Sequence, residues 1–173
     1  MSGPAPACPV PAAGTGITRW LALAALLLVL DQATKVYFDS LLEYGERLHV
    51  LPFFDFTLLY NRGAAFSFLA GAAGWQRWLF TLLGVAAAVF IVWTMRRNRS
   101  QRLFLLALSL ILGGALGNVI DRLLHGHVID FLLFYWRDWY YPAFNLADIG
   151  ITCGAVLLVL DEILRMRRRR RTA

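Results

Sequence analysis

Charged residues are scarce in this chain of 173 residues. They form 16% of the sequence, and 59% of it is hydrophobic, whereas a soluble domain usually carries about 25% charged residues. This deficit excludes an ordinary soluble domain and indicates a membrane protein, with a length that fits one domain. Cysteine is also rare. Cys8 and Cys153 provide neither a disulfide framework nor the ligand spacing of a zinc site.

The N-terminus lacks the features of a cleavable signal peptide. The first residues carry no positive charge, and no small-residue cleavage site follows the first apolar run. Residues 1–16 are rich in proline, alanine and glycine and are expected to form a flexible tail. We therefore expect the first apolar run to remain in the protein as a membrane anchor.

Four apolar segments are each close to the length that crosses a bilayer, about 20 helical residues. They cover residues 17–38, 78–95, 103–120 and about 144–164. The predicted fold class is therefore an α-helical membrane protein with four transmembrane helices. These helices belong to one domain that covers residues 17–165.

Arginines cluster on one predicted side of the membrane. They lie at the start of the first segment, between the second and the third, and after the fourth: Arg19, Arg96, Arg97, Arg99, Arg102, Arg165 and Arg167–Arg171. By the positive-inside rule this side is the cytoplasm, and both termini are expected there. The basic tail, residues 166–173, is interpreted as contacting anionic lipid. Nucleic-acid binding is the alternative for such a charge run, and we do not expect it.

Two longer connections fall on the opposite side. Residues 39–77 contain β-branched and aromatic residues punctuated by Pro52 and Gly63, a pattern that favours short strands and a small interfacial sheet. Residues 121–143 contain four large aromatic residues, Trp136, Trp139, Tyr140 and Tyr141. They are typical of an aromatic belt at the level of lipid headgroups. Contact with a substrate is the alternative interpretation.

Polar residues of the predicted helices and outer connections fall near one level, at the outer face. They are Asp31, Lys35, Asn61, Arg62, Asn118, Asp121, Arg122, Asp130, Asn145 and Asp148. Ionisable groups among apolar neighbours cost free energy to bury, and they usually have a functional role. This level is therefore the predicted functional site.

Asp130 and Asp148 are the candidates for chemistry. Two facing carboxylates can hold one proton between them, because both cannot ionise cheaply at close range. One then acts as a base on water while the other protonates the carbonyl oxygen under attack, which is acid–base peptide hydrolysis. A helix-capping role for Asp148 with Asn145, and an interfacial loop position for Asp130, are the alternatives.

The sequence offers little for other catalytic chemistries. It has no HExxH motif and no serine on a sharp glycine-flanked turn. His125 and His127 form a short HGH motif, but a metal site would require further ligands. We expect no metal and no cofactor.

The other polar residues have supporting interpretations. Asp31 and Lys35 are spaced i,i+4 and can pair on the helix surface. Gly63 lies at a bend where backbone can approach a ligand closely. Three residues near the end of the third segment can clamp it to its neighbours or contact a substrate: Asn118, Asp121 and Arg122.

Two other classes of membrane protein compete with a hydrolase. A transporter can relay protons through buried acids, but such proteins often show internal repeats or broken helices, and neither is visible. A scaffold would use the polar residues only to hold helices together. Solute transport into vesicles, or the absence of any turnover, would distinguish these classes from a peptidase.

Five motifs, in order, resemble bacterial lipoprotein signal peptidase, also called signal peptidase II. They are DQATK, YNRGAAFSF, GGALGNVIDR, GHVIDF and YPAFNLADIGI. The resemblance covers roughly residues 17–165, almost the whole chain. It implies an aspartic peptidase of the bacterial inner membrane. A periplasmic β-cradle is implied at about residues 39–77, between the first two helices, and a mobile periplasmic arm at about residues 121–143.

The resemblance also implies roles for individual residues. Asp130 and Asp148 match the two catalytic aspartates of the family. The other characteristic polar positions match Asp31, Lys35, Asn61, Gly63, Asn118, Asp121, Arg122 and Asn145. The implied substrates are prolipoproteins whose cysteine carries diacylglycerol, with cleavage just before that cysteine. The cyclic peptide globomycin is the implied inhibitor, and we expect a monomer that works in membrane lipid.

Overall fold

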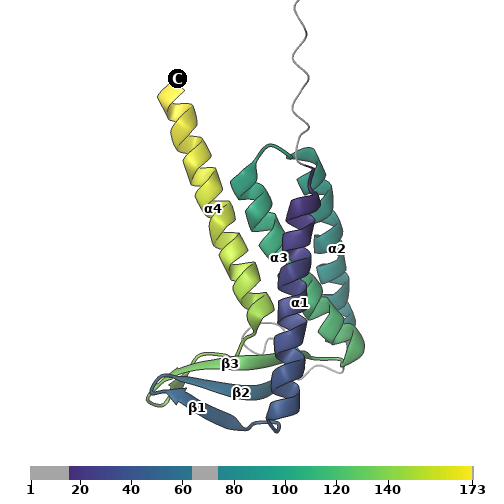
Figure 1. Cartoon of the computed structure of the whole chain (residues 1–173), viewed down its shortest axis with the longest axis vertical. Helices are drawn as coiled ribbons and strands as arrows, with labels where there is room; N and C mark the ends of the chain where they lie inside the picture. Colours follow the sequence, from purple (N-terminus) through teal and green to yellow (C-terminus); the bar gives the residue numbers. More distant parts are fainter. Residues whose placement is uncertain (1–15, 64–73, 173) are drawn as a thin grey trace, which may run out of the picture.

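The computed structural model describes residues 16–63 and 74–172. The described residues form four helices and four strands, labelled in chain order in Figure 1. The helices are α1 Thr18–Leu41, α2 Trp75–Arg97, α3 Arg102–Leu124 and α4 Leu146–Thr172. The strands are β1 Arg47–Leu51, β2 Phe54–Asn61, β3 Val128–Trp136 and β4 Trp139–Tyr140. The predicted tail at residues 1–16 lies almost wholly outside the described residues.

Among the described helices, α1, α2 and α3 are long and apolar enough to cross a membrane. The protein is therefore a multi-pass membrane protein. The fourth predicted span forms helix α4, which exposes Val156 and Val159 as a lipid-facing helix would. Its C-terminal part carries Asp161, Glu162 and the arginine run, so a fourth crossing stays a prediction.

Helix α3 is the central helix of the bundle and packs against α1, α2 and α4 (Figure 1). Its glycines allow these close approaches. A Cβ atom on Gly114 would lie 2.3 Å from the carbonyl oxygen of Ala147 at the start of α4. A Cβ atom on Gly117 would lie 2.3 Å from a carboxylate oxygen of Asp31 in α1. Small residues let helix backbones approach in lipid, and here they bring polar groups of three helices together.

The four strands form one antiparallel sheet in the order β1-β2-β3-β4. It lies across one end of the helix bundle, whereas the C-terminus of α4 lies at the other end (Figure 1). The sequence predicted strands only between the first two membrane helices. The structure places β3 and β4, from the predicted arm, in the same sheet, because β3 pairs along most of β2. The arm is thus part of the sheet over residues 128–140.

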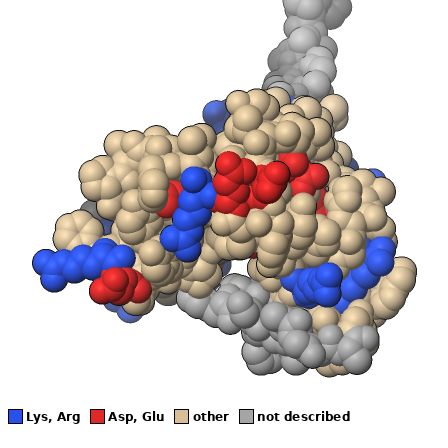
Figure 2. Space-filling view, turned by 90° about the horizontal axis from the view of Figure 1, so that it is seen from below, with Lys and Arg blue, Asp and Glu red and all other residues tan. Residues whose placement is uncertain are grey.

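The free face at this end of the molecule carries charged side chains among uncharged ones. Figure 2 shows a group of acidic side chains near the middle of the face, basic ones to either side, and a further acidic group beside the basic one at the left. Asp39, Glu43 and Glu46, at the end of α1 and the approach to β1, are all exposed. Trp136 and Trp139, of the predicted aromatic belt, are 67% and 64% exposed at the β3–β4 turn. Charges beside large exposed aromatic rings are typical of the boundary between water and lipid.

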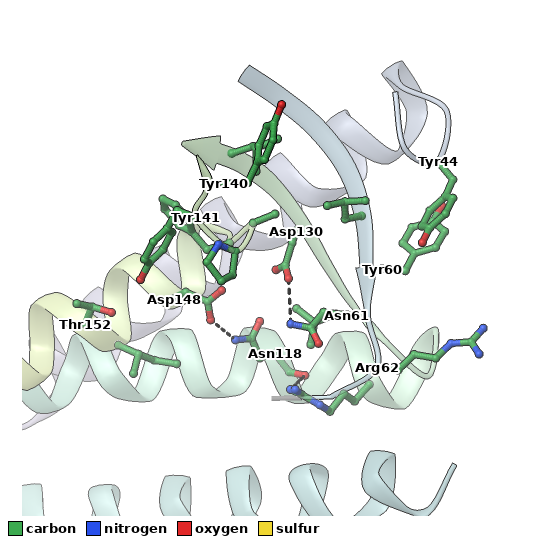
Figure 3. Close-up of a pocket in the computed structure, with 18 of the residues that line it drawn as sticks. Tyr44, Tyr60, Asn61, Arg62, Asn118, Asp130, Tyr140, Tyr141, Asp148 and Thr152 are labelled. Carbon is green, nitrogen blue, oxygen red and sulfur yellow. Dashed lines mark hydrogen bonds between the residues drawn. The ribbon is translucent and has the colours of Figure 1, made fainter. Parts of the chain in front are cut away.

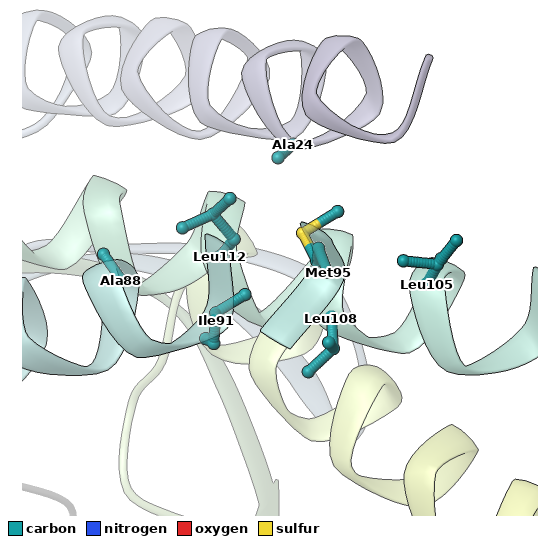
Figure 4. Close-up of a cluster of buried hydrophobic side chains, with 7 residues drawn as sticks. All are labelled: Ala24, Ala88, Ile91, Met95, Leu105, Leu108 and Leu112. Atoms are coloured by element: carbon teal, nitrogen blue, oxygen red, sulfur yellow. The ribbon is translucent and has the colours of Figure 1, made fainter. Parts of the chain in front are cut away.

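Two apolar clusters hold the structure together. One lies between the helices, where Ile91 and Met95 of α2 meet Leu105 and Leu112 of α3 (Figure 4). The other joins the end of α1 to the sheet, where the ring of Phe38 stacks on that of Phe131 with 4.5 Å between the centroids. Burial of apolar surface is the main stabilising contribution of such clusters. The second cluster fixes the central strand β3 against α1.

Candidate active site

Asp130 lies within β3, between the buried side chains of Ile129 and Phe131, and is itself only 3% exposed. Its Cα pairs with that of Leu59 on β2, beside an irregularity in the β2–β3 register. Asn61, at the end of β2, donates a hydrogen bond from Nδ2 to Asp130 Oδ2 at 3.1 Å (Figure 3). The sheet, rather than a loop, therefore positions this carboxylate.

Asp148 lies in the first turn of α4 and forms a reciprocal cap with Asn145. The backbone N–H of Asp148 donates to Asn145 Oδ1 at 3.0 Å, and the backbone N–H of Asn145 donates to Asp148 Oδ2 at 3.2 Å. This is the geometry of a capping box. The positive end of the helix dipole also stabilises negative charge at this position. The capping role predicted as an alternative is real, and it orients the carboxylate.

Asparagine side chains connect the two carboxylates. Asn145 Nδ2 donates to Asp130 Oδ1 at 2.7 Å, and Asn118 Nδ2, from α3, donates to Asp148 Oδ1 at 2.9 Å (Figure 3). Asn145 thus contacts Asp130 through its side chain and Asp148 through its cap. Each carboxylate accepts two N–H groups, so both are held in place before any substrate binds.

The orientation of each of these three amides is determined by its oxygen, which can only accept hydrogen bonds. Asn145 Oδ1 accepts from the Asp148 backbone, Asn61 Oδ1 accepts from the Gly63 backbone at 3.0 Å, and Asn118 Oδ1 accepts from Lys35 Nζ at 3.0 Å. A flipped amide would place two donors against each other. The NH₂ groups must therefore face the aspartates.

Behind the aspartates lies a buried ion cluster. Lys35 Nζ lies 2.8 Å from Asp31 Oδ2 and 2.9 Å from Asp121 Oδ2. Asp31 accepts the backbone N–H of Ala147 at 2.8 Å, and Asp121 accepts that of Ile129 at 3.1 Å. The cluster therefore joins α1 and α3 to the starts of α4 and β3, next to Asp148 and Asp130. The predicted pairing of Asp31 with Lys35 is present, but the predicted surface position is wrong, because both side chains are almost fully buried.

Arg122 acts as the clamp considered from the sequence. Its Nη2 donates to the carbonyl oxygen of Gly63 at 2.9 Å, and its Nη1 donates to that of Asn118 at 3.1 Å. The guanidinium also lies over the ring of Phe80 in α2. Arg122 therefore links α2 and α3 to the end of β2, and it adds positive charge near both aspartates.

A cavity of about 1300 Å³ opens onto this arrangement, and both aspartates line it. The predicted residues divide into two groups around it. Those that line the cavity, besides the aspartates, are Asn61, Arg62, Asn118 and Arg122. Those that lie outside its lining are Asp31, Lys35, Gly63, Asp121 and Asn145. The second group supports the first through the hydrogen bonds described above.

Several residues of the site gave no sequence signal as single positions. Gln32 donates to Asp121 at 2.8 Å and so belongs to the ion cluster. Tyr44, Tyr60 and Arg47 line the cavity from the sheet side, and Thr152 lines it from α4. Gln32 lies in the DQATK motif and Tyr60 in the YNRGAAFSF motif, and these motifs were the available hints.

The surroundings of Asp130 favour its protonated form. Burial, the larger cause, and the negative charge of Asp148 raise the pKa of Asp130 to about 8, although hydrogen bonds from Asn61 and Asn145 act in the opposite direction. A carboxyl group with such a pKa can donate a proton at neutral pH. Asp148 receives two N–H donors and the helix N-terminus, which stabilise its charge. The two carboxylates thus have the unequal environments that acid–base catalysis requires.

Fold and site together describe a multi-pass membrane protein in which two aspartates line one cavity, as the carboxylates of an aspartic peptidase would. Comparison with known proteins agrees with this class. The family model for signal peptidase (SPase) II matches residues 23–164, and the chain belongs to that family of aspartic peptidases.

Relatives and a solved structure extend the match over nearly the whole chain. The chain is 59% identical to the lipoprotein signal peptidase of Ralstonia nicotianae over 155 residues, which is 90% of each protein. It is 57% identical to that of Cupriavidus necator over 157 residues, 91% of this chain and 90% of the relative. A solved bacterial membrane enzyme superposes with a TM-score of 0.77 at 28% identity, over 87% of this chain and 90% of that one.

Proposed function

We propose that this protein removes the signal peptide from prolipoproteins whose cysteine carries diacylglycerol, and that it cuts the peptide bond just before that cysteine. The observation that carries the proposal is the pair Asp130 and Asp148 on the wall of one cavity, each oriented by asparagine amides. Family membership supplies the peptidase activity on lipoprotein precursors. The pair supplies a chemical route for it.

In this route Asp148 is the base and Asp130 the acid. Asp148 takes a proton from a water molecule, which attacks the scissile carbonyl carbon, while Asp130 donates its proton to the carbonyl oxygen. The resulting tetrahedral diol collapses when Asp148 passes its proton to the amide nitrogen and Asp130 recovers its own from a hydroxyl. The C–N bond breaks, and both carboxyl groups return to their starting states. Each step is general acid–base catalysis without a covalent intermediate.

The fold suits a substrate that is itself anchored in lipid. We place the sheet and the cavity at the periplasmic face of the inner membrane, with four crossings and both termini in the cytoplasm, because the arginine-rich segments lie at the other end of the bundle. Ile151 and Thr152 of α4 bring the cavity wall onto a helix that exposes apolar residues to lipid. Acyl chains can then stay in the bilayer while the scissile bond reaches the aspartates.

The remaining partner predictions follow from membership of the family. Globomycin is expected to block the cavity, the working unit is expected to be a monomer, and nucleic acid is not an expected partner. The two tails, residues 1–16 and 166–173, are expected to flank the peptidase domain of residues 17–165 without a role in cleavage.

The acid–base assignment predicts how cleavage depends on pH. Because burial raises the pKa of Asp130 to about 8, this group holds its proton at neutral pH and loses it as the pH rises through that value. The value of kcat/KM should therefore fall above about pH 8, by roughly tenfold per pH unit once Asp130 is mostly ionised. Circular dichroism at each pH, and recovery of the rate on return to pH 7, control for unfolding. A rate that keeps rising to about pH 10, as with an amine or hydroxyl nucleophile, would exclude this assignment.

A further inference from the structure

A second cavity, of about 620 Å³, lies between α1, α2 and α3 and shares no lining residue with the aspartate cavity. Ala24 and Ala25 of α1 form one wall, Ala88 of α2 belongs to the other, and Leu112 and Leu116 of α3 form the floor. Figure 4 shows Ala24 directed from α1 toward the other two helices. We refer to this cavity as the α1–α2 groove.

The groove exists because of how the helices pack. Both α1 and α2 pack extensively on α3, and neither packs extensively on the other. Alanines at positions 24, 25 and 88 are too short to fill the remaining space. Ala25 is an exposed residue on the groove wall. The result is an apolar channel along the bundle surface, of the kind that a bilayer would fill with hydrocarbon.

One charged residue lines the groove, and it is basic. Arg96, in the last turn of α2, is exposed, and among the described residues no acidic one lines the groove with it. The next residue, Arg97, holds its guanidinium over the ring of Trp93 at 4.2 Å from the ring centroid, and Trp93 also lines the groove. A cation and an indole ring at the mouth of an apolar channel match the headgroup and chain of an anionic lipid.

We propose that the α1–α2 groove binds an acyl chain of a phospholipid with a net negative headgroup, and that Arg96 pairs with the headgroup phosphate. This lipid contacts α1 and α2 at the same time, so it bridges two helices that pack extensively on α3 but not on each other. It is a structural lipid. It is separate from the lipid of the substrate, because the groove and the aspartate cavity have no residue in common.

The test is native mass spectrometry of the purified full-length protein in detergent. Delipidated protein is mixed with equal amounts of phosphatidylglycerol and phosphatidylcholine that carry the same acyl chains. We expect the wild type to retain phosphatidylglycerol over phosphatidylcholine by about fivefold, the effect of one interfacial cation. The variant Arg96→Gln should lose this preference. The variant Arg102→Gln, which removes an exposed arginine outside the groove, should keep it.

A second variant, Ala25→Leu, tests the channel itself. The leucine fills part of the groove from an exposed position, so the fold should be retained and retention of both lipids should fall. The proposal is overturned if Arg96→Gln keeps the wild-type preference, or if Ala25→Leu retains lipid as the wild type does. It is also overturned if the wild type does not distinguish the headgroups.

Cleavage by Ala25→Leu should equal that of the wild type. A slower rate with unchanged lipid retention would assign the groove to the substrate's signal helix instead. This result would leave the aspartate mechanism intact.

Discussion

Asp130→Asn and Asp148→Asn are each expected to abolish measurable cleavage of a lipidated precursor without preventing folding. A positioned general acid or base contributes about 10²–10⁴-fold to a rate, and each substitution removes one of the two proton carriers. Asparagine keeps the size of aspartate and one acceptor oxygen, so contacts to Asn61 or Asn118 can persist. The loss should therefore appear in kcat more than in KM, because the cavity keeps its shape.

The control for these variants is Asp138→Asn, in the exposed turn between β3 and β4. It removes the same charge on the same side of the molecule but outside the cavity lining, so its rate should equal that of the wild type. Thermal unfolding in detergent verifies that all three variants are folded. A folded Asp130→Asn or Asp148→Asn protein that keeps more than about a tenth of the wild-type rate would exclude that residue as a proton carrier.

Lys35→Met is expected to have the largest effect on stability. Lys35 is the single lysine of the chain, and it separates the carboxylates of Asp31 and Asp121 at 1% exposure. Its loss would leave two buried acids without a counter-charge. Breaking a buried ion pair by removal of one partner costs about 3–5 kcal/mol. We expect a marked decrease in melting temperature, or a failure to accumulate folded protein, whereas Arg102→Gln should change neither.

A triple variant, Asp31→Asn/Lys35→Met/Asp121→Asn, separates stability from catalysis. It removes all three charges, and the asparagine oxygens can still accept the backbone N–H groups of Ala147 and Ile129. Much of the lost stability should return, because no unpaired charge remains buried. Cleavage should stay slow, because the amide of Asn118 has lost the ammonium group that fixes its orientation. If the single variant Lys35→Met is as stable as the wild type, the ion cluster contributes little to the free energy of folding.

The helical part of the fold could be predicted from the sequence because it is a local property. Apolar runs of membrane-spanning length became α1, α2 and α3 with ends shifted by a few residues. The contribution of β3 to the sheet could not be predicted, because its pairing with β2 joins residues about 70 positions apart. The sequence favours an aromatic belt in this segment, with substrate contact as the alternative. In the structure, Tyr140 and Tyr141 line the aspartate cavity, whereas Trp136 and Trp139 are exposed at the β3–β4 turn.

The site shows a similar division. The level at which polar residues gather was predictable from their distance to the helix ends, and the Asn145–Asp148 cap from its three-residue spacing. Which of these residues line the cavity and which support them could not be predicted, because this division depends on how α1, α3, α4 and the sheet pack together. Lys35 illustrates this point. Its i,i+4 spacing from Asp31 indicated a pair on the helix surface, but close packing at Gly117 buries the pair against α3.

The most direct test of the central claim is the mass of the products formed from two matched precursors. The purified protein, in lipid-containing detergent, is given a prolipoprotein with diacylglycerol on its cysteine and, separately, the same chain without the modification. We predict two products from the lipidated precursor, the free signal peptide and a lipoprotein that begins at the modified cysteine, and an intact unlipidated precursor. An intact lipidated precursor in the presence of folded protein, or a cut at any other bond, would contradict the account.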